Sequence, residues 1–273
     1  MIDIHCHILP EMDDGPESLG EALAMCRAAA GDGIRTLVAA PHFKPGTYEF
    51  SGRRLLDAIG ILQAAAKKEG MDVTILPGAE VAVSPEMTSH LEPGGHLMIN
   101  GGRYFFAEFR PLSVPSHWDT FLLSFLASGM APIIAHPERN AWFINHPDAL
   151  SAAVQSGILV QITAASITGG FGEEARDFSI YLLRHNLVHA IASDGHSADL
   201  RPPRLAEAVR LAAEVVGEER ARALVTSIPQ AIIEDRKIPA LAPVEPYPPI
   251  REQDRNWFQR LRGKRGDSSR LLE

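Results

Sequence analysis

The sequence has little of what marks several common protein classes. Only two of its 273 residues are cysteines, Cys6 and Cys26, which is too few for a disulfide framework and predicts a reducing compartment. No apolar run approaches the ~20 residues that cross a bilayer, and the first five residues lack the basic and long apolar regions of a secretory signal. The formal net charge of −8 offers no basic excess for a nucleic-acid backbone. We therefore expect a cytoplasmic protein that neither spans a membrane nor binds nucleic acid.

Motifs of nucleotide binding and of nucleophilic catalysis are also missing. The chain has no glycine-rich dinucleotide loop, no Walker A loop and no glycine-flanked nucleophile elbow. A cysteine-dependent phosphatase needs an arginine six positions after its cysteine, where this chain has Met12 after Cys6 and Asp32 after Cys26. These absences argue against chemistry that depends on a nucleophilic side chain.

The composition and the hydrophobic pattern indicate an α/β enzyme. Hydrophobic residues make up 45% and charged residues 22% of the chain, as in ordinary globular proteins. Seven apolar runs read as strands, at 2–7, 36–42, 73–82, 104–109, 131–136, 159–164 and 188–194. They lack strict alternation, as buried parallel strands do, and amphipathic segments separate them. Because polar residues follow so many of these runs, the pattern favours a closed (β/α)7 TIM-like barrel, with its site at the C-terminal strand ends, over an open sheet.

Potential metal ligands gather at the ends of these runs. His5 and His7 stand two residues apart in a strand, so their side chains point to the same side. Past this run come Asp13 and Asp14, and the spacing alone accepts either carboxylate as a ligand. Four further runs end in equivalent residues, namely His42, Glu80, His136, and Asp194 with His196. This arrangement predicts one polynuclear metal site, whereas the six remaining histidines are expected to have surface or structural roles.

The types of residue in this set indicate the chemistry. Imidazole and carboxylate together suit Mn, Fe or Zn. A bridging carboxylate such as Glu80 holds two cations ~3.5–4 Å apart, where a hydroxide held between them would attack phosphorus in line. Arg139 and Arg201 follow two of the strand ends, and guanidinium forks suit phosphate oxygens. The alternative for each arginine is a structural ion pair, with Glu138 and Asp199 respectively.

These residues resemble those of a known family. The supporting segments are the opening Met-Ile-Asp-Ile-His-Cys-His, Asp13-Asp14-Gly15-Pro16, Ala39-Ala40-Pro41-His42, Pro77-Gly78-Ala79-Glu80, Phe106-Ala107-Glu108-Phe109, Ile134-Ala135-His136-Pro137-Glu138-Arg139, Ala192-Ser193-Asp194-Gly195-His196 and Arg201-Pro202-Pro203. As an ordered set they are similar to the polymerase-and-histidinol-phosphatase (PHP) superfamily. More narrowly, the chain resembles the bacterial manganese-dependent protein-tyrosine phosphatases of capsule and exopolysaccharide operons, from residue 1 to about 238.

The resemblance implies a distorted seven-stranded barrel of the PHP type with three divalent metal ions, most commonly Mn. By it, the first metal is held by His5, His7, Glu80 and Asp194, the second by Glu80, Glu108 and His136, and the third by Asp14, His42 and His196. Glu108 enters through the resemblance only. Arg139 and Arg201 match positions that bind phosphate. The implied substrate is phosphotyrosine in the tail of a polysaccharide-assembly tyrosine kinase, and homo-oligomers are implied as well.

Three alternatives stay open at this point. Histidinol-phosphate phosphatases share the barrel and the metals, whereas a nuclease or proofreading relative fits the acidic chain poorly. A binding protein that uses its metals only structurally belongs to a different class. The loop 43–50 either packs beside the phenyl ring of the substrate or acts as a lid or hinge, and the general acid is unassigned.

The composition changes near residue 240, which predicts two regions. We expect a phosphatase barrel over 1–240 and a separate segment over 241–273, which opens with four prolines and ends with seven Lys/Arg against four Asp/Glu in its last 23 residues. Trp257, Phe258 and Leu261 lie on one side of a short helical pattern in this segment. It is either a solvated tail or a docking element for another subunit, a partner or an anionic membrane surface.

Overall fold

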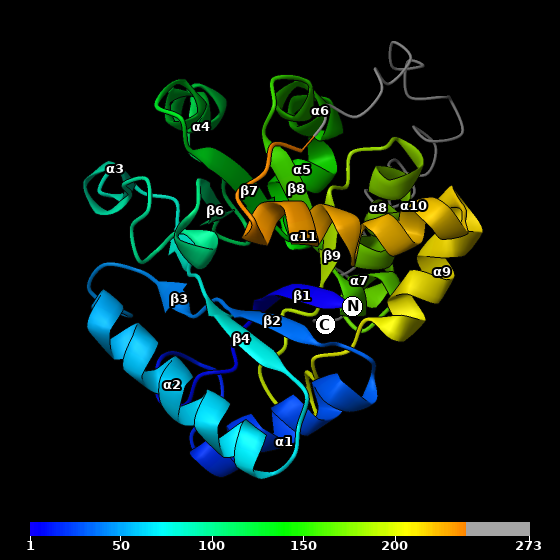
Figure 1. The fold of residues 1–273 in the computed structure, drawn as a ribbon. Helices are drawn as coiled ribbons and strands as arrows, with labels where there is room; N and C mark the ends of the chain where they lie inside the picture. Colours follow the sequence, from blue (N-terminus) through cyan, green and yellow to red (C-terminus); the bar gives the residue numbers. More distant parts are fainter. Residues whose placement is uncertain (239–273) are drawn as a thin grey trace, which may run out of the picture. The chain divides into compact units, whose positions relative to one another are not determined.

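Parallel β-strands form the centre of the structure. The computed structural model describes residues 1–238, and the predicted connector and tail at 241–273 lie outside the described residues. Within residues 1–238 there are nine strands: β1 (Ile2–Cys6), β2 (Thr36–Ala39), β3 (His42–Phe43), β4 (Thr74–Pro77), β5 (Glu80–Ala82), β6 (Tyr104–Glu108), β7 (Ala131–Ala135), β8 (Leu159–Thr163) and β9 (Ala190–Ala192). They pair in parallel in the orders β1-β2-β4 and β3-β5-β6-β7-β8-β9 (Figure 1).

Two of the seven predicted strands are broken, which corrects their expected boundaries. The run 36–42 divides into β2 and β3 at Ala40–Pro41, where proline offers no N–H to a ladder. The run 73–82 divides into β4 and β5 at Gly78, where a Cβ atom would lie 2.7 Å from Val38 Cγ1. At each of these two positions the chain leaves the first sheet, which holds β2 and β4, and enters the second sheet, which holds β3 and β5.

Backbone contacts also join the last strand to the first. The Asp194 amide just past β9 donates to His5 O at 2.9 Å, and the His7 amide donates to Gly195 O at 2.9 Å. The buried carboxylate of Asp3 accepts hydrogen bonds from the amide and the hydroxyl of Ser193. Residues just past β9, the last strand of the second sheet, thus lie beside β1, the first strand of the first sheet. The predicted α/β fold with parallel strands in a TIM-like arrangement is therefore confirmed.

Helices cover the outside of the strands. They are α1 (Leu19–Gly31), α2 (Gly52–Lys68), α3 (Met87–His90), α4 (Trp118–Ala127), α5 (Ala141–Asn145), α6 (Pro147–Gln155), α7 (Ala164–Ile167), α8 (Gly172–Arg184), α9 (Ala206–Val216), α10 (Glu218–Ala223) and α11 (Ser227–Ile233), with 3₁₀ turns η1 (Ile99–Gly101) and η2 (Pro137–Arg139). In α2, the apolar residues Leu55, Ile59, Leu62 and Ala66 recur at helical spacing and are all buried. Ser51 caps this helix, since its hydroxyl accepts from the Arg54 amide at 3.3 Å.

Helix α11 lies across the N-terminal ends of the strands (Figure 1). Its Ile232 and Ile233 belong to the buried cluster that includes Ile2 and Tyr104, the first residues of β1 and β6. The Tyr104 hydroxyl donates to Arg236 O at 2.7 Å just past this helix. One end of the barrel is thus filled by apolar side chains, which leaves the opposite end for the polar residues.

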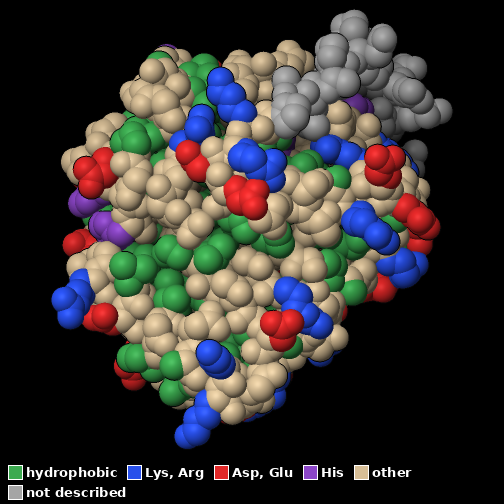
Figure 2. Space-filling view, viewed as in Figure 1, with side chains coloured by type: hydrophobic (Ala, Val, Ile, Leu, Met, Phe, Trp, Pro, Cys, Tyr) green, Lys and Arg blue, Asp and Glu red, His purple; other side chains and the backbone are tan. Residues whose placement is uncertain are grey.

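The molecular surface on the α11 side carries charges of both signs. Figure 2 shows Lys and Arg side chains interspersed with Asp and Glu over this face. Within residues 1–238, none of the helices combines the length and the apolar character that a membrane crossing requires.

His189, just before β9, allows a prediction about stability. It is buried and its Nδ1 accepts a hydrogen bond from the Val160 amide at 3.1 Å. Burial, together with the charge of Arg220, lowers the pKa of His189 from 6.5 to about 3. The unfolded chain therefore binds a proton that the folded chain does not, and between pH 6.5 and pH 3 the free energy of unfolding falls by about 1.4 kcal/mol per pH unit as the pH is lowered.

We expect His189→Gln to show a shallower loss of stability than the wild type between pH 6.5 and pH 4. Urea denaturation at several pH values in the presence of a chelator measures this slope. His90→Gln, at an exposed position, is the matched control and should keep the wild-type slope. Equal slopes for wild type and His189→Gln would contradict the role assigned to His189.

Candidate metal centre

The two histidines of β1 are held so that they face the same point. His5 and His7 are fully buried, and their Nε2 atoms lie 3.2 Å apart. His5 Nδ1 lies 2.9 Å from Gln161 Oε1, and His7 Nδ1 lies 2.6 Å from Asp13 Oδ2. With each Nδ1 donating to its oxygen, both Nε2 lone pairs point inward, the arrangement that supporting residues give to metal-binding histidines.

The structure distinguishes the roles of Asp13 and Asp14, either of which the spacing accepted as a metal ligand. Both carboxylate oxygens of Asp13 are engaged in hydrogen bonds. Besides its contact with His7, Oδ2 accepts from the His42 amide at 2.8 Å, and Oδ1 accepts from the Gly15 amide at 3.0 Å. Asp14 is half exposed, and its Oδ1 lies 3.5 Å from His42 Nε2 and 3.4 Å from His196 Nε2. Asp14 therefore faces the cluster, whereas Asp13 orients His7 from behind.

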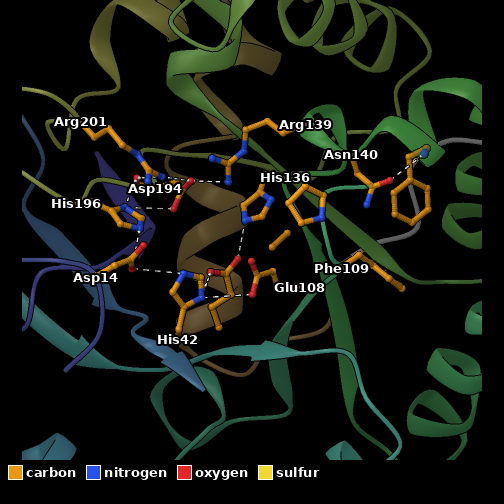
Figure 3. A pocket seen from close by; sticks show the side chains of 14 residues that line it. Asp14, His42, Glu108, Phe109, His136, Arg139, Asn140, Asp194, His196 and Arg201 are labelled. Atoms are coloured by element: carbon orange, nitrogen blue, oxygen red, sulfur yellow. Dashed lines mark hydrogen bonds and ion pairs between the residues drawn. The ribbon is translucent and has the colours of Figure 1, made fainter. Parts of the chain in front are cut away.

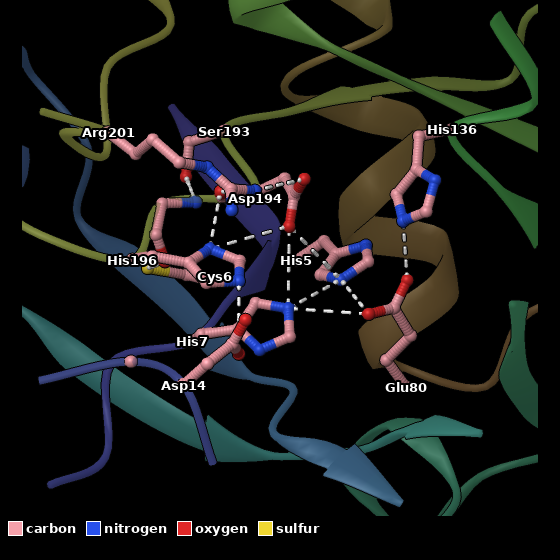
Figure 4. A network of polar contacts seen from close by, with 12 residues as sticks. His5, Cys6, His7, Asp14, Glu80, His136, Ser193, Asp194, His196 and Arg201 are labelled. Atoms are coloured by element: carbon pink, nitrogen blue, oxygen red, sulfur yellow. Dashed lines mark hydrogen bonds and ion pairs between the residues drawn. The ribbon is translucent and has the colours of Figure 1, made fainter. Parts of the chain in front are cut away.

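Glu80, the first residue of β5, turns its carboxylate toward the histidines of the cluster (Figure 4). Its Oε1 is 2.6 Å from His136 Nε2. Its Oε2 lies 3.5 Å from His5 Nε2, 3.4 Å from His7 Nε2 and 3.0 Å from His42 Nδ1. Burial alone would raise the pKa of Glu80, but the imidazoles of His5 and His136 hold it well below its usual range, so the carboxylate is anionic.

Asp194 joins the histidines to the two arginines. Its Oδ1 lies 3.4 Å from His7 Nε2, while its Oδ2 forms an ion pair with Arg139 Nη2 at 2.6 Å and accepts a hydrogen bond from Arg201 Nη2 at 2.7 Å (Figure 3). Burial would raise the pKa of Asp194, but Arg139 and His7 hold it well below its usual range. Asp194 and His136 both have positive φ, at 51° and 33°, a conformation that costs energy in residues other than glycine and is often found at functional sites.

All nine predicted metal ligands come together at this end of the strands. Their ligand atoms form four overlapping groups, each within 4.8 Å: His7, Asp14, His42 and His196; His5, His7 and Glu80; His5, His136 and Asp194; and His42, Glu80 and Glu108. In the last group, His42 accompanies Glu80 and Glu108, whereas the resemblance implied His136 as their partner.

Divalent cations fit this set of side chains. Glu80 Oε2 is buried and anionic, yet no hydrogen-bond donor satisfies it. Two imidazole Nε2 atoms facing each other at 3.2 Å repel unless a cation or proton is shared between them. Imidazole nitrogens and carboxylate oxygens together are the donors that Mn, Fe and Zn accept.

The two arginines are placed by an aromatic ring as well as by Asp194. The guanidinium carbon of Arg139 lies 4.6 Å from the centroid of Phe171, and that of Arg201 lies 5.5 Å from it. The Nε atom of each arginine is buried without a hydrogen-bond partner. Glu138 instead accepts from the Thr163 amide at 3.0 Å, so the expected alternative of an Arg139–Glu138 ion pair is not what the structure has.

The alternative for Arg201 is likewise not observed. Arg201 pairs with Asp194, and Asp199 Oδ1 accepts from the Leu200 amide at 2.8 Å. Both guanidinium groups thus turn toward the ligand cluster.

A cavity of about 200 Å³ opens onto the ligands (Figure 3). Its polar side is formed by the ligand cluster, Arg139 and Arg201, and its apolar side by Phe109, Pro111 and Phe143. Asn140, at the cavity edge, caps α5 by accepting from the Trp142 amide at 2.9 Å. No pattern in the sequence singles out these wall residues. In the loop 43–50, Tyr48 stacks on His42 with ring centroids 5.8 Å apart, and the choice between a contact with the phenyl ring and a lid or hinge stays a prediction.

Cys6 is unsuited to act as a nucleophile. Its thiol is buried and lies 3.6 Å from Gly195 O, and burial raises its pKa well above the usual range.

A parallel α/β barrel with histidines and carboxylates at the C-terminal strand ends defines the class of TIM-barrel-like hydrolase folds. Histidinol phosphate phosphatase from Lactococcus lactis shows this likeness of fold, with a TM-score of 0.50 and 13% identity over 81% of this chain and 93% of that chain. The family model for capsular polysaccharide synthesis, CpsB/CapC, matches residues 1–234. The chain belongs to the CpsB/CapC family, as the resemblance in its motifs predicted.

Similar proteins cover most of the chain. Tyrosine-protein phosphatase YwqE of Bacillus subtilis is 36% identical over 219 residues, which are 80% of this chain and 86% of that protein. Tyrosine-protein phosphatase CpsB of Streptococcus agalactiae is 31% identical over 246 residues, which cover 87% of this chain and 100% of that protein. A structure from work on YwqE and Streptococcus pneumoniae CpsB, described as unique metal-dependent tyrosine phosphatases, matches with a TM-score of 0.85 and 34% identity over 90% of this chain and 99% of that chain.

Proposed function

We propose that this protein is a metal-dependent protein-tyrosine phosphatase. The observation that carries the proposal is the position of Asp194, whose two oxygens face the histidine cluster on one side and both arginines on the other. A bound phosphate group is stabilised by positive charge around its oxygens, and guanidinium forks beside a metal cluster supply that charge. The names of the similar family members support the same activity.

We propose three divalent ions, preferably Mn, in the partition that the resemblance implies. One would be held by His5, His7, Glu80 and Asp194, one by Glu80, Glu108 and His136, and one by Asp14, His42 and His196. Bound divalent ions supply Lewis-acid charge and make water a better nucleophile at neutral pH. The donor chemistry accepts Fe or Zn as well.

The side chains of the chain itself bind and orient the substrate. Arg139 and Arg201 contact the phosphate oxygens and neutralise their charge, and Phe171 holds the two guanidinium groups in place before the substrate arrives. The phenyl ring of the substrate packs against Phe109 and Phe143, which form the apolar side of the cavity.

The biological substrate we propose is phosphotyrosine in the tail of a polysaccharide-assembly tyrosine kinase, in keeping with the family's link to capsule synthesis. Cys6 and Cys26 are both free thiols, which supports a cytoplasmic location. Assembly into homo-oligomers stays a prediction.

Hydrolysis by metal-stripped protein reloaded with manganese tests the proposal. We expect turnover of a phosphotyrosine peptide to exceed that of histidinol phosphate and to fall by about 10³-fold or more on chelation, because the metals supply several kcal/mol of transition-state stabilisation. Preference for histidinol phosphate would instead favour the histidinol-phosphate phosphatases. An absence of turnover with metals fully loaded would favour a binding protein with structural metals.

A further inference from the structure

A second cavity lies beside the metal pocket. It has a volume of about 300 Å³ and shares Arg201 with the metal pocket. Phe171, whose ring contacts both arginines of the phosphate site, forms part of its wall. Arg201 therefore lies at the boundary between the metal pocket, where the phosphotyrosine is proposed to bind, and the second cavity.

The charge in this second cavity comes from Arg204. Arg204 is exposed and forms no ion pair with any residue among 1–238, whereas Arg201 pairs with Asp194 in the metal pocket. Glu207 also lines the cavity, but its two oxygens accept from Arg210 at 3.1 and 2.8 Å. Among the described lining residues, Arg204 is thus the one cation that is neither paired nor turned toward the metal pocket.

The rest of the lining suits the carbon atoms of a side chain. Ala164 and Ala208 also line the cavity, and their small, buried side chains leave room for a ligand. Leu200, which also lines the cavity, is 87% exposed, so its side chain is accessible to a ligand. A short aliphatic stem that ends in a negative charge matches this combination of walls.

We propose that the second cavity is a subsite for an acidic residue of the substrate peptide that flanks the phosphotyrosine in sequence. The carboxylate of this residue pairs with Arg204, and its methylene groups pack against Leu200. The inference rests on the proposed phosphatase function and adds a sequence preference to it. Because the pair with Arg204 is close to solvent, it contributes a modest factor, about fivefold in affinity.

Binding and turnover are measured separately to test it. Peptides that carry phosphonomethyl-phenylalanine in place of phosphotyrosine resist hydrolysis, so their dissociation constants report binding alone. The peptides are identical except that Glu, Gln, Lys or Leu occupies the flanking positions. We expect the manganese-loaded protein to bind the Glu peptide about fivefold more tightly than the Gln peptide, with the Lys peptide weaker still.

Charge reversal identifies the residue. Arg204→Glu should reverse the order of the Glu and Lys peptides, while hydrolysis of a small aryl phosphate stays unchanged because Arg204 lies outside the metal pocket. Arg222→Glu, an exposed arginine on α10, is the matched control and should keep the wild-type order.

The two proposals fail in different ways. Equal affinities for the Glu, Gln and Lys peptides overturn the subsite even when the small aryl phosphate is hydrolysed normally. Tightest binding of the Leu peptide, unaffected by Arg204→Glu, also overturns it and makes the cavity an apolar subsite. Loss of small aryl phosphate hydrolysis in the wild type overturns the phosphatase function, whereas the peptide affinities still decide the subsite.

Discussion

Replacing Glu80 with glutamine is expected to lower kcat/KM by about 10³-fold or more, which corresponds to about 4 kcal/mol. Glu80 Oε2 lies within 3.5 Å of nitrogens of His5, His7 and His42 and has no hydrogen-bond donor of its own. Glutamine keeps the shape of the side chain but removes the negative charge at the position where the proposed cations meet. The loss should therefore appear in metal content as well as in rate.

Elemental analysis and steady-state kinetics on the same samples measure this effect. We expect Glu80→Gln to hold fewer manganese ions per chain than the wild type, with circular dichroism unchanged. Glu214→Gln, at an exposed position on α9, is the matched control and should retain both metal and activity. Full metal content with near-normal turnover in Glu80→Gln would exclude Glu80 from the centre of the site.

The ligands at the strand ends could be predicted because the sequence itself orders them. His5 and His7 have the spacing that places two side chains on one side of a strand, and His136 and Asp194 follow apolar runs directly. Parallel strands bring such ends to one place whatever the connections between them. The arrangement of this part of the site thus follows from local pattern together with one rule of topology.

Other parts of the site depend on contacts that no local pattern contains. Asp13 and Asp14 are adjacent, and only the turn after β1 decides that Asp13 reaches back to His7 while Asp14 faces His196. Gln161 and Phe171 act through partners at least 30 residues away in the chain. Glu108 ends a strand with a single carboxylate, which is an ordinary feature of many strands.

The break of two predicted strands has a similar cause. Gly78 reads as a strand residue until the close approach of Val38 is known, because the constraint comes from the neighbouring strand. Pro41 carries a local signal for an interruption, whereas the continuation of the chain into a second sheet depends on the curvature of the whole barrel.

The second large effect is expected from the two arginines. Arg139→Ala and Arg201→Ala should each lower kcat/KM by about 10- to 100-fold, since a charge-assisted hydrogen bond contributes roughly 1.5–3 kcal/mol. Metal content should stay at the wild-type value, which separates these variants from Glu80→Gln. Arg139→Lys should recover only part of the loss, because an ammonium group keeps the charge but lacks the planar fork.

The double variant provides the sharper test of the geometry. Both guanidinium groups reach the same oxygen, Asp194 Oδ2, at 2.6 and 2.7 Å, so either one can move toward a shared phosphate when the other is removed. Each single substitution then understates the contribution of its arginine, and the loss in Arg139→Ala/Arg201→Ala should exceed the product of the two single losses. Kinetics of the four proteins on one aryl phosphate measure this coupling. A double loss equal to that product would show that the two arginines contribute independently, and a smaller one that they act as a unit; either result would contradict the expected compensation.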